Sequence, residues 1–228
     1  MKTKIILVAP QYPENIGLIA RAMENFGVKE LLLVNPKASV SHARAKSRAM
    51  HAQETLAKAR TYSSLEKALE EVDYAIATTA KTGNGKKIYR TAITPRKLAE
   101  KFAGTNAVIG IVFGREDRGL ENHEIRQCDF IASIPANANY PTLNIGHAAA
   151  IFFYELFSAN KKQELKTASR KTKKTMLEKV EKLVINSKTI ENKESVMLAF
   201  KALLGRAIVT EKEARAMLSL FSEMQGKD

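Results

Sequence analysis

Five short apolar runs, rich in Val and Ile, place the strongest constraint on the fold of this chain. The runs are residues 5–9, 30–35, 74–79, 107–114 and 130–135. None of them alternates apolar with polar residues, which is typical of strands that are covered on both faces of a parallel sheet. Helical patterns separate the runs, near residues 15–27, 44–59, 64–71, 95–102, 121–126 and 146–158. This order predicts an α/β fold, a parallel sheet flanked by helices, whose ligands bind beyond the carboxyl ends of the strands.

The pattern changes after about residue 160. Residues 161–182 are strongly basic and carry no strand pattern. Three amphipathic helices are predicted, with apolar faces of Met176, Val180, Leu183 and Val184, then Met197, Phe200 and Leu204, then Ala214, Met217, Leu218 and Phe221. We therefore expect residues 1–160 to form one domain, and residues 161–228 to form a basic linker with a small all-α C-terminal extension.

Charge and cysteine content narrow the class of protein. Lys and Arg number 37 against 24 Asp and Glu, a formal net charge of +13. Such a field attracts a polyanion, most often nucleic acid, although Lys-rich surfaces also serve solubility or thermal stability. The single cysteine, Cys128, excludes an intramolecular disulfide framework and favours a reducing, cytoplasmic compartment. No stretch approaches the ~20 apolar residues that span a bilayer, so we expect no membrane partner.

Common catalytic and binding motifs are missing from the chain. It contains no phosphate-binding G-x-x-x-x-G-K-[ST], no strand followed by G-x-G-x-x-G, no H-E-x-x-H and no G-x-S-x-G. The four histidines have no metal-ligand spacing. We therefore expect no metal, no P-loop, no ordinary dinucleotide site and no triad hydrolase.

Three polar islands remain, each directly after an apolar run. In the first, PENIGLIARAMENFG, Asn15, Gly17 and Arg21 fall outside the expected buried stripe. By spacing, Arg21 is either an exposed partner for Glu24 or a group that the helix presents for function. Gly17 favours the second interpretation, because a glycine early in a helix costs stability and usually permits a close approach.

The second and third islands each have a plain structural alternative. In VFGREDRGLENHEIRQCD, Gly114 and Gly119 bracket a charged turn that contains Glu116, which could be only a turn before a helix. In SIPANANYPTLNIGHAAAIFFYEL, a loop with two prolines enters an apolar helix, and Asn144 could be only its cap.

Together the islands resemble the SPOUT family of RNA methyltransferases, in its ribose 2′-O-methyltransferase branch typified by TrmH and TrmJ. The first motif of that branch, N-x-G-x-x-x-R, is met by Asn15, Gly17 and Arg21. The second, G-x-E-x-x-G-L, is met by residues 114–120, and the third, with its S/T-L-N core, by residues 142–144. The tail from residue 193 onward looks like the helical extension of the TrmJ group.

The resemblance implies a C-terminal trefoil knot in the sheet domain and a homodimer whose active site uses both chains. It also implies S-adenosyl-L-methionine as methyl donor and tRNA as substrate, at the ribose of nucleotide 32 in the anticodon loop. A ribosomal-RNA methyltransferase on the same fold, or a non-catalytic RNA-binding protein, are the alternatives.

The resemblance also implies the roles of individual residues. Catalysis falls to Arg21, supported by Asn15, Asn144 and Thr142. Because a free guanidinium is a poor base, we expect Arg21 mainly to steady the developing alkoxide and to orient the ribose or phosphate. Donor binding falls to Thr79, Ala80, Gly114, Glu116, Ile134, Pro135, Thr142, Leu143 and Asn144. Several relatives carry a serine two residues after the third-motif asparagine, where this chain has Gly146.

A basic loop near the expected site is the candidate for RNA contact. It spans residues 81–97 and contains Lys81, Lys86, Lys87, Tyr89 and Arg90. Cations in such a loop grip phosphates, and a tyrosine can stack on a base. The plain alternative is a solvated loop.

Overall fold

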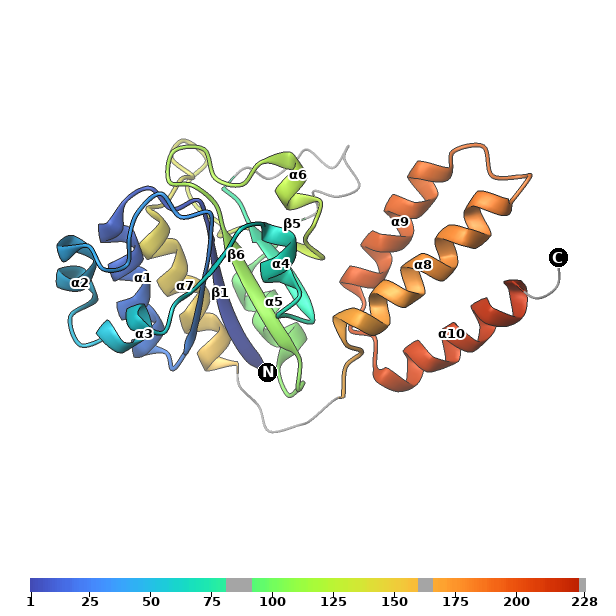
Figure 1. Cartoon of the computed structure of the whole chain (residues 1–228), viewed down its shortest axis with the longest axis horizontal. Coiled ribbons are helices and arrows are strands. Elements are labelled where there is room, and N and C mark those ends of the chain that lie inside the picture. The colour runs from blue at the N-terminus through green and yellow to red at the C-terminus, as the bar shows by residue number, and fades with distance from the viewer. Residues whose placement is uncertain (81–91, 160–165, 226–228) are drawn as a thin grey trace.

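The computed structural model describes residues 1–80, 92–159 and 166–225. Within these residues, seven parallel strands form one sheet in the order β3-β2-β1-β6-β4-β7-β5 (Figure 1). The strands are β1 (Lys2–Val8), β2 (Glu30–Val34), β3 (Arg60–Tyr62), β4 (Tyr74–Thr78), β5 (Ala92–Ile93), β6 (Val108–Phe113) and β7 (Phe130–Ala132). The predicted parallel sheet is confirmed.

Helices cover both faces of the sheet, as the unbroken apolar strands require. They are α1 (Pro13–Asn25), α2 (Ala43–Ala49), α3 (Gln53–Ala57), α4 (Leu65–Leu69), α5 (Pro95–Phe102), α6 (Asn122–Ile125) and α7 (Ile145–Ser158). The larger core joins one face of the sheet to α1, α5 and α7, and a smaller core joins the other face to α4. The polar islands therefore lie where strands meet helices at the carboxyl edge.

Two expectations about individual elements were wrong. The single helix expected over residues 44–59 is broken into α2 and α3 at Met50, whose φ of 51° lies in the left-handed region. The short strands β3 and β5 were missed, because β3 is a largely exposed edge strand and β5 has only two residues. An edge strand needs no apolar run, so its sequence carries little signal.

Gly17 explains how α1 and α2 come together. A Cβ at this position would lie 2.2 Å from the carbonyl oxygen of Ala45 and 2.9 Å from the Cβ of Arg48. The glycine is buried and lets the backbones of the two helices touch. The close approach that this glycine predicts is therefore confirmed, and it is the packing of α1 against α2.

The described tail contains α8 (Arg170–Asn186), α9 (Lys193–Arg206) and α10 (Glu211–Gln225), as predicted (Figure 1). They share a core that includes Met176, Val180, Leu204 and Phe221. Much of the segment expected to be a basic linker belongs to α8. Ser169 caps the start of this helix by accepting a hydrogen bond from the backbone N–H of Thr172. We propose that the tail is a unit with its own core.

A buried lysine fastens this tail to the sheet. The Nζ of Lys173 donates to the carbonyl oxygen of Asp73 and lies 3.1 Å from the ring centroid of Tyr74. Burial lowers the pKa of Lys173 to about 8. The backbone N–H of Thr167 adds a 3.0 Å hydrogen bond to the side chain of Asn106. The tail is thus held by specific polar contacts as well as by apolar packing.

Replacing Gly17 with alanine tests the helix contact. The new Cβ would overlap the Ala45 carbonyl, so we expect Gly17→Ala to lower the free energy of unfolding by at least about 2 kcal/mol. Urea denaturation provides the measurement. Arg21→Ala, on the exposed side of the same helix, should change stability by less than about 0.5 kcal/mol. Equal stability of wild type and Gly17→Ala would show that the two helices can separate freely.

Candidate active site

A cavity of about 830 Å³ lies at the carboxyl edge of the sheet. Thr79 and Ala80 after β4, residues 114–123 after β6, Ile134 after β7 and residues 141–145 before α7 line it. Segments far apart in the chain thus meet at one place, as expected for a parallel sheet. The volume suits a ligand of nucleoside size, since small-molecule pockets typically measure about 300–1,000 Å³.

The turn after β6 explains both glycines of the second island. The backbone groups of Arg115 and Gly119 exchange two hydrogen bonds, of 2.8 and 3.1 Å, which close a tight turn. Gly119 has a φ of 73°, and a Cβ on Gly114 would lie 2.1 Å from the backbone of Gly119. Both positions therefore require glycine. The turn carries Glu116 at a fixed place between its ends.

Glu116 reaches from this turn to the start of α1. Its carboxylate accepts hydrogen bonds from the backbone N–H groups of Gln11 at 3.0 Å and Tyr12 at 3.3 Å. The Nδ2 of Asn15 donates to the same carboxylate at 3.2 Å. A negative charge beside the N-terminus of a helix is favourable, because free N–H groups and the helix dipole meet there. Glu116 therefore joins the first and second islands.

Asn15 and Asn144 join the third island to the other two. The Nδ2 of Asn144 donates to the Oδ1 of Asn15 at 3.3 Å, and its Oδ1 accepts from the backbone N–H of Gly146 at 2.8 Å. Asn144 is thus the predicted cap of α7 and also one end of a Glu116–Asn15–Asn144 chain of contacts. A Cβ at Gly146 would lie 3.2 Å from both Leu18 and the Asn144 side chain, so glycine lets α7 approach α1 closely.

An ion pair fixes the wall of the cavity that α6 forms. The guanidinium of Arg115 binds both carboxylate oxygens of Glu124, at 2.9 and 3.0 Å, and the Glu124 side chain is only 6% exposed. This contact raises the pKa of Arg115. Glu121 and Glu124 also form a reciprocal cap at the start of α6. These residues were missed as part of the site, although E-x-x-E before an apolar residue resembles a capping pattern.

Most of the predicted donor-binding residues line the cavity. Those that do are Thr79, Ala80, Gly114, Glu116, Ile134, Thr142, Leu143 and Asn144. Pro135 is exposed and lies outside this lining. Asn15 also lies outside it and reaches the wall only through Glu116 and Asn144. The predicted RNA contacts Lys81, Lys86, Lys87, Tyr89 and Arg90 fall outside the described residues.

Arg21 is exposed on α1 and does not line the cavity of its own chain. Of the two interpretations of Arg21, the structure does not show the ion pair with Glu24, whose carboxylate binds Lys29 at 3.0 Å instead. Among the residues that the structure describes, Arg21 makes no ion pair. The ring of Phe26, directly after α1, packs against Tyr154 and Phe157 of α7, at centroid distances of 6.2 and 6.1 Å. These rings join the C-terminal end of α1 to α7.

No group of three or more His, Cys, Asp or Glu side chains in residues 1–80, 92–159 and 166–225 could hold a metal ion. Over the same ranges, no helix is both long enough and apolar enough to cross a membrane.

Burial raises the pKa of the Cys128 thiol to about 12, so this group is not a reactive nucleophile at neutral pH.

The sequence matches a known family over most of the sheet domain. Residues 2–154 fit the model of the SpoU rRNA Methylase family. The chain belongs to this family. This match confirms the family resemblance that the three motifs indicated.

Relatives and solved structures extend the similarity into the tail. The chain is 38% identical to "tRNA (cytidine-2′-O-)-methyltransferase TrmJ" of Methanocaldococcus jannaschii over 224 residues, covering 95% of this chain and 97% of that one. It is 29% identical to the protein of the same name from Sulfolobus acidocaldarius, over 98% of this chain and 94% of the relative. The crystal structure of TrmJ from Z. mobilis superposes with a TM-score of 0.76 at 27% identity, covering 99% of this chain and all of that one.

A double-mutant cycle tests the contact between the first two islands. We expect Asn15→Ala and Glu116→Ala to be coupled by about 1 kcal/mol in the free energy of unfolding, because each removes one end of the same hydrogen bond. The control pair is Glu14 and Arg44, an ion pair 2.9 Å apart whose arginine side chain is 72% exposed. Its coupling should stay below about 0.5 kcal/mol. Additive effects of the Asn15 and Glu116 changes would contradict the contact.

Proposed function

We propose that the chain is an S-adenosylmethionine-dependent methyltransferase that acts on the 2′-hydroxyl of a tRNA ribose. The observation that carries the proposal is the Glu116–Asn15–Asn144 chain of contacts, which joins all three motifs at one wall of the cavity. Similarity to the two TrmJ proteins over nearly the whole chain supports tRNA as the RNA. The net charge of +13 suits such a polyanion.

The cavity fits the methyl donor in size and lining. Apolar side chains of Ile134, Leu143 and Ile145 alternate with loop backbone around it, which suits an adenine held between loops. We propose that Thr79, Ala80, Gly114, Glu116, Ile134, Thr142, Leu143 and Asn144 hold the donor. When bound, S-adenosylmethionine supplies a sulfonium methyl group, whose bond to sulfur breaks as a bond to the ribose oxygen forms and the hydroxyl proton leaves.

We propose that Arg21 stabilises the ribose oxygen as it loses its proton. A guanidinium is a poor base but offers five donors in a rigid fork, which suits a developing alkoxide or a neighbouring phosphate. Asn15 and Asn144 fix the starts of α1 and α7 relative to each other. Thr142 lines the cavity, and we propose that its hydroxyl contacts the substrate. These residues position groups rather than supply a nucleophile.

We propose a homodimer, because the site is incomplete in one chain. Arg21 is exposed and lies outside the cavity of its own chain, and Tyr154 and Phe157 of α7 are 55% and 61% exposed. Ile151 on the same helix is 37% exposed. Pairing this face with a second copy buries the apolar surface and offers Arg21 to the other copy's cavity. The trefoil knot, the cytoplasmic setting and nucleotide 32 belong to the same proposal through the family resemblance.

Nucleoside analysis tests the activity. After incubation with tRNA and donor, mass spectrometry should detect 2′-O-methylated nucleosides with wild type, and Arg21→Ala should lower the rate at least about 100-fold, as loss of a charge-stabilising donor does. Calorimetry should show donor binding by both proteins. Methylation of ribosomal RNA alone would favour the first alternative, and no donor binding would favour an RNA-binding protein. Near-normal turnover by Arg21→Ala would refute the role of Arg21.

Mixed dimers test whether Arg21 acts across the interface. Arg21→Ala and Leu143→Arg, which fills the cavity with a charged side chain, should each be inactive alone. Dimers that contain one copy of each, isolated through two different affinity tags, should recover about half of the wild-type rate, because one complete site forms in each symmetric dimer. Inactive mixed dimers would place Arg21 and the donor in the same chain.

A further inference from the structure

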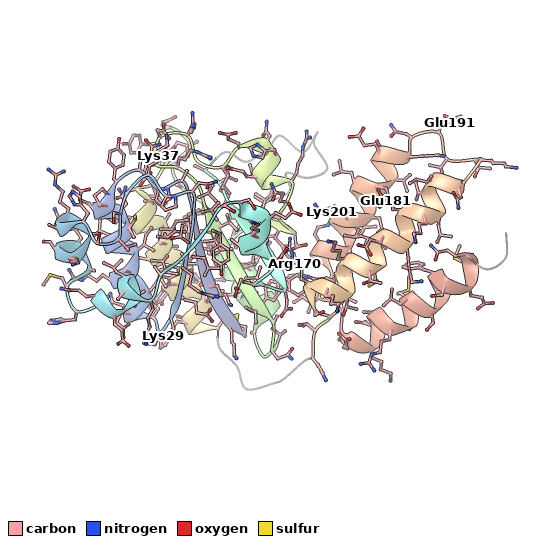
Figure 2. All side chains as sticks on the ribbon, in the orientation of Figure 1. Lys29, Lys37, Arg170, Glu181, Glu191 and Lys201 are labelled. Carbon is pink, nitrogen blue, oxygen red and sulfur yellow. The ribbon has the colours of Figure 1, made fainter. Side chains whose placement is uncertain are left out.

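The C-terminal helices α8 and α9 contact residues 126–129, which directly follow one of the helices that line the cavity. Residues 126–129 connect α6 to β7, and α6 lines the cavity through Asn122 and Ile125. Lys201 of α9 donates from its Nζ to the carbonyl oxygen of Arg126 at 2.7 Å. Arg170 of α8 donates to the carbonyl oxygen of Gln127 at 3.4 Å and lies 3.5 Å from the carboxylate of Asp129. In Figure 2 both cations lie where the helical unit meets the sheet domain, whereas Glu181 and Glu191 lie farther out on the tail.

A glycine on α9 brings the tail backbone against the same segment. A Cβ at Gly205 would lie 2.7 Å from the carbonyl oxygen of Asp129 and 3.0 Å from its Cβ. The helix therefore rests directly on the residue before β7, and only glycine allows this approach. Arg170, Lys201 and Gly205 together are called the tail clamp below. They hold three of the four residues from 126 to 129.

Helix α6 depends on contacts outside itself. It has four residues, and isolated helices shorter than about 12 residues are marginal in water. Its first turn is fixed by the Arg115–Glu124 ion pair and by the Glu121–Glu124 cap. The cations of the tail clamp bind the carbonyl oxygens of Arg126, the C-cap residue, and of Gln127, directly after the helix. The cavity wall is thus held at one end by its own loop and at the other end by the tail.

We propose that the tail clamp positions α6 for donor binding, so that the C-terminal helices set the affinity for S-adenosylmethionine without touching it. None of the described residues 166–225 lines the cavity, so the effect passes through α6. Lys201 and Arg170 are positioning residues in this arrangement. The inference rests on the proposed function, because it assigns the cavity to the methyl donor.

Calorimetry with S-adenosylmethionine and the full chain, without RNA, tests the inference. Lys201→Met should raise the Kd for the donor about tenfold, a typical size for a coupling residue. Lys201→Arg should restore most of the affinity, because arginine can donate to the same carbonyl. Gly205→Ala should weaken binding in the same way by displacing α9. Arg206→Met, an exposed cation at the end of the same helix, should leave the Kd unchanged.

Hydrogen exchange of the ligand-free protein gives a second readout that needs no donor. Backbone amides of residues 122–129 should exchange faster in Lys201→Met and Gly205→Ala than in wild type or Arg206→Met, while amides of α1 should not change. Equal Kd values for wild type and the folded Lys201→Met and Gly205→Ala variants would overturn the inference. If wild type itself failed to bind the donor, the proposed function would fail, and exchange would still report whether the clamp holds α6.

Discussion

The carboxylate of Glu116 is the contact on which the geometry of the site depends. Helix α1 begins without a side-chain cap of its own, since Tyr12 occupies the cap position. Glu116 instead accepts from the backbone N–H groups of Gln11 and Tyr12, just before the helix, and from the side chain of Asn15, 101 residues away in the sequence. A charged acceptor makes stronger hydrogen bonds than a neutral one. The start of α1 is therefore fixed to the turn after β6, and through Asn144 to the start of α7. Three loops that shape one cavity share a single polar junction.

The same junction determines what Arg21 can do. Gly17 lets α1 pack closely against α2, and Gly146 lets α7 approach α1, so α1 has a close neighbour on two sides. Arg21 lies on the exposed side of α1, and α7 exposes Tyr154 and Phe157. A long cation on a closely packed helix is well suited to a site that a second molecule completes. The glycine of the first motif thus serves the arginine indirectly, through packing.

The sequence was sufficient to predict a sheet with helices on both faces and a group of polar residues at the carboxyl ends of its strands. Unbroken apolar runs indicate strands that are covered on both faces of a parallel sheet. Polar residues directly after such strands lie at the same edge of the sheet. It was insufficient for Met50, whose left-handed φ breaks a helix that periodicity predicts as continuous. It was equally insufficient for the contacts of Gly17 and Gly205. A glycine can indicate that another backbone comes close, but it does not indicate which segment of the chain that backbone belongs to. The partners of Glu124 and Arg170 lie on other elements, so no local pattern could pair them.

Some of the basic side chains bind acceptor groups within the protein. Bulk charge was interpreted as attraction to a polyanion, yet Arg115, Lys173 and Lys201 each bind a carboxylate or a carbonyl oxygen within the protein. Lys173 is buried, and moving it there costs free energy that its contacts with Asp73 and Tyr74 partly offset. Cations with such partners are not free to neutralise phosphates. Part of the positive excess, on Lys173 and Lys201, therefore holds the helical tail against the sheet domain.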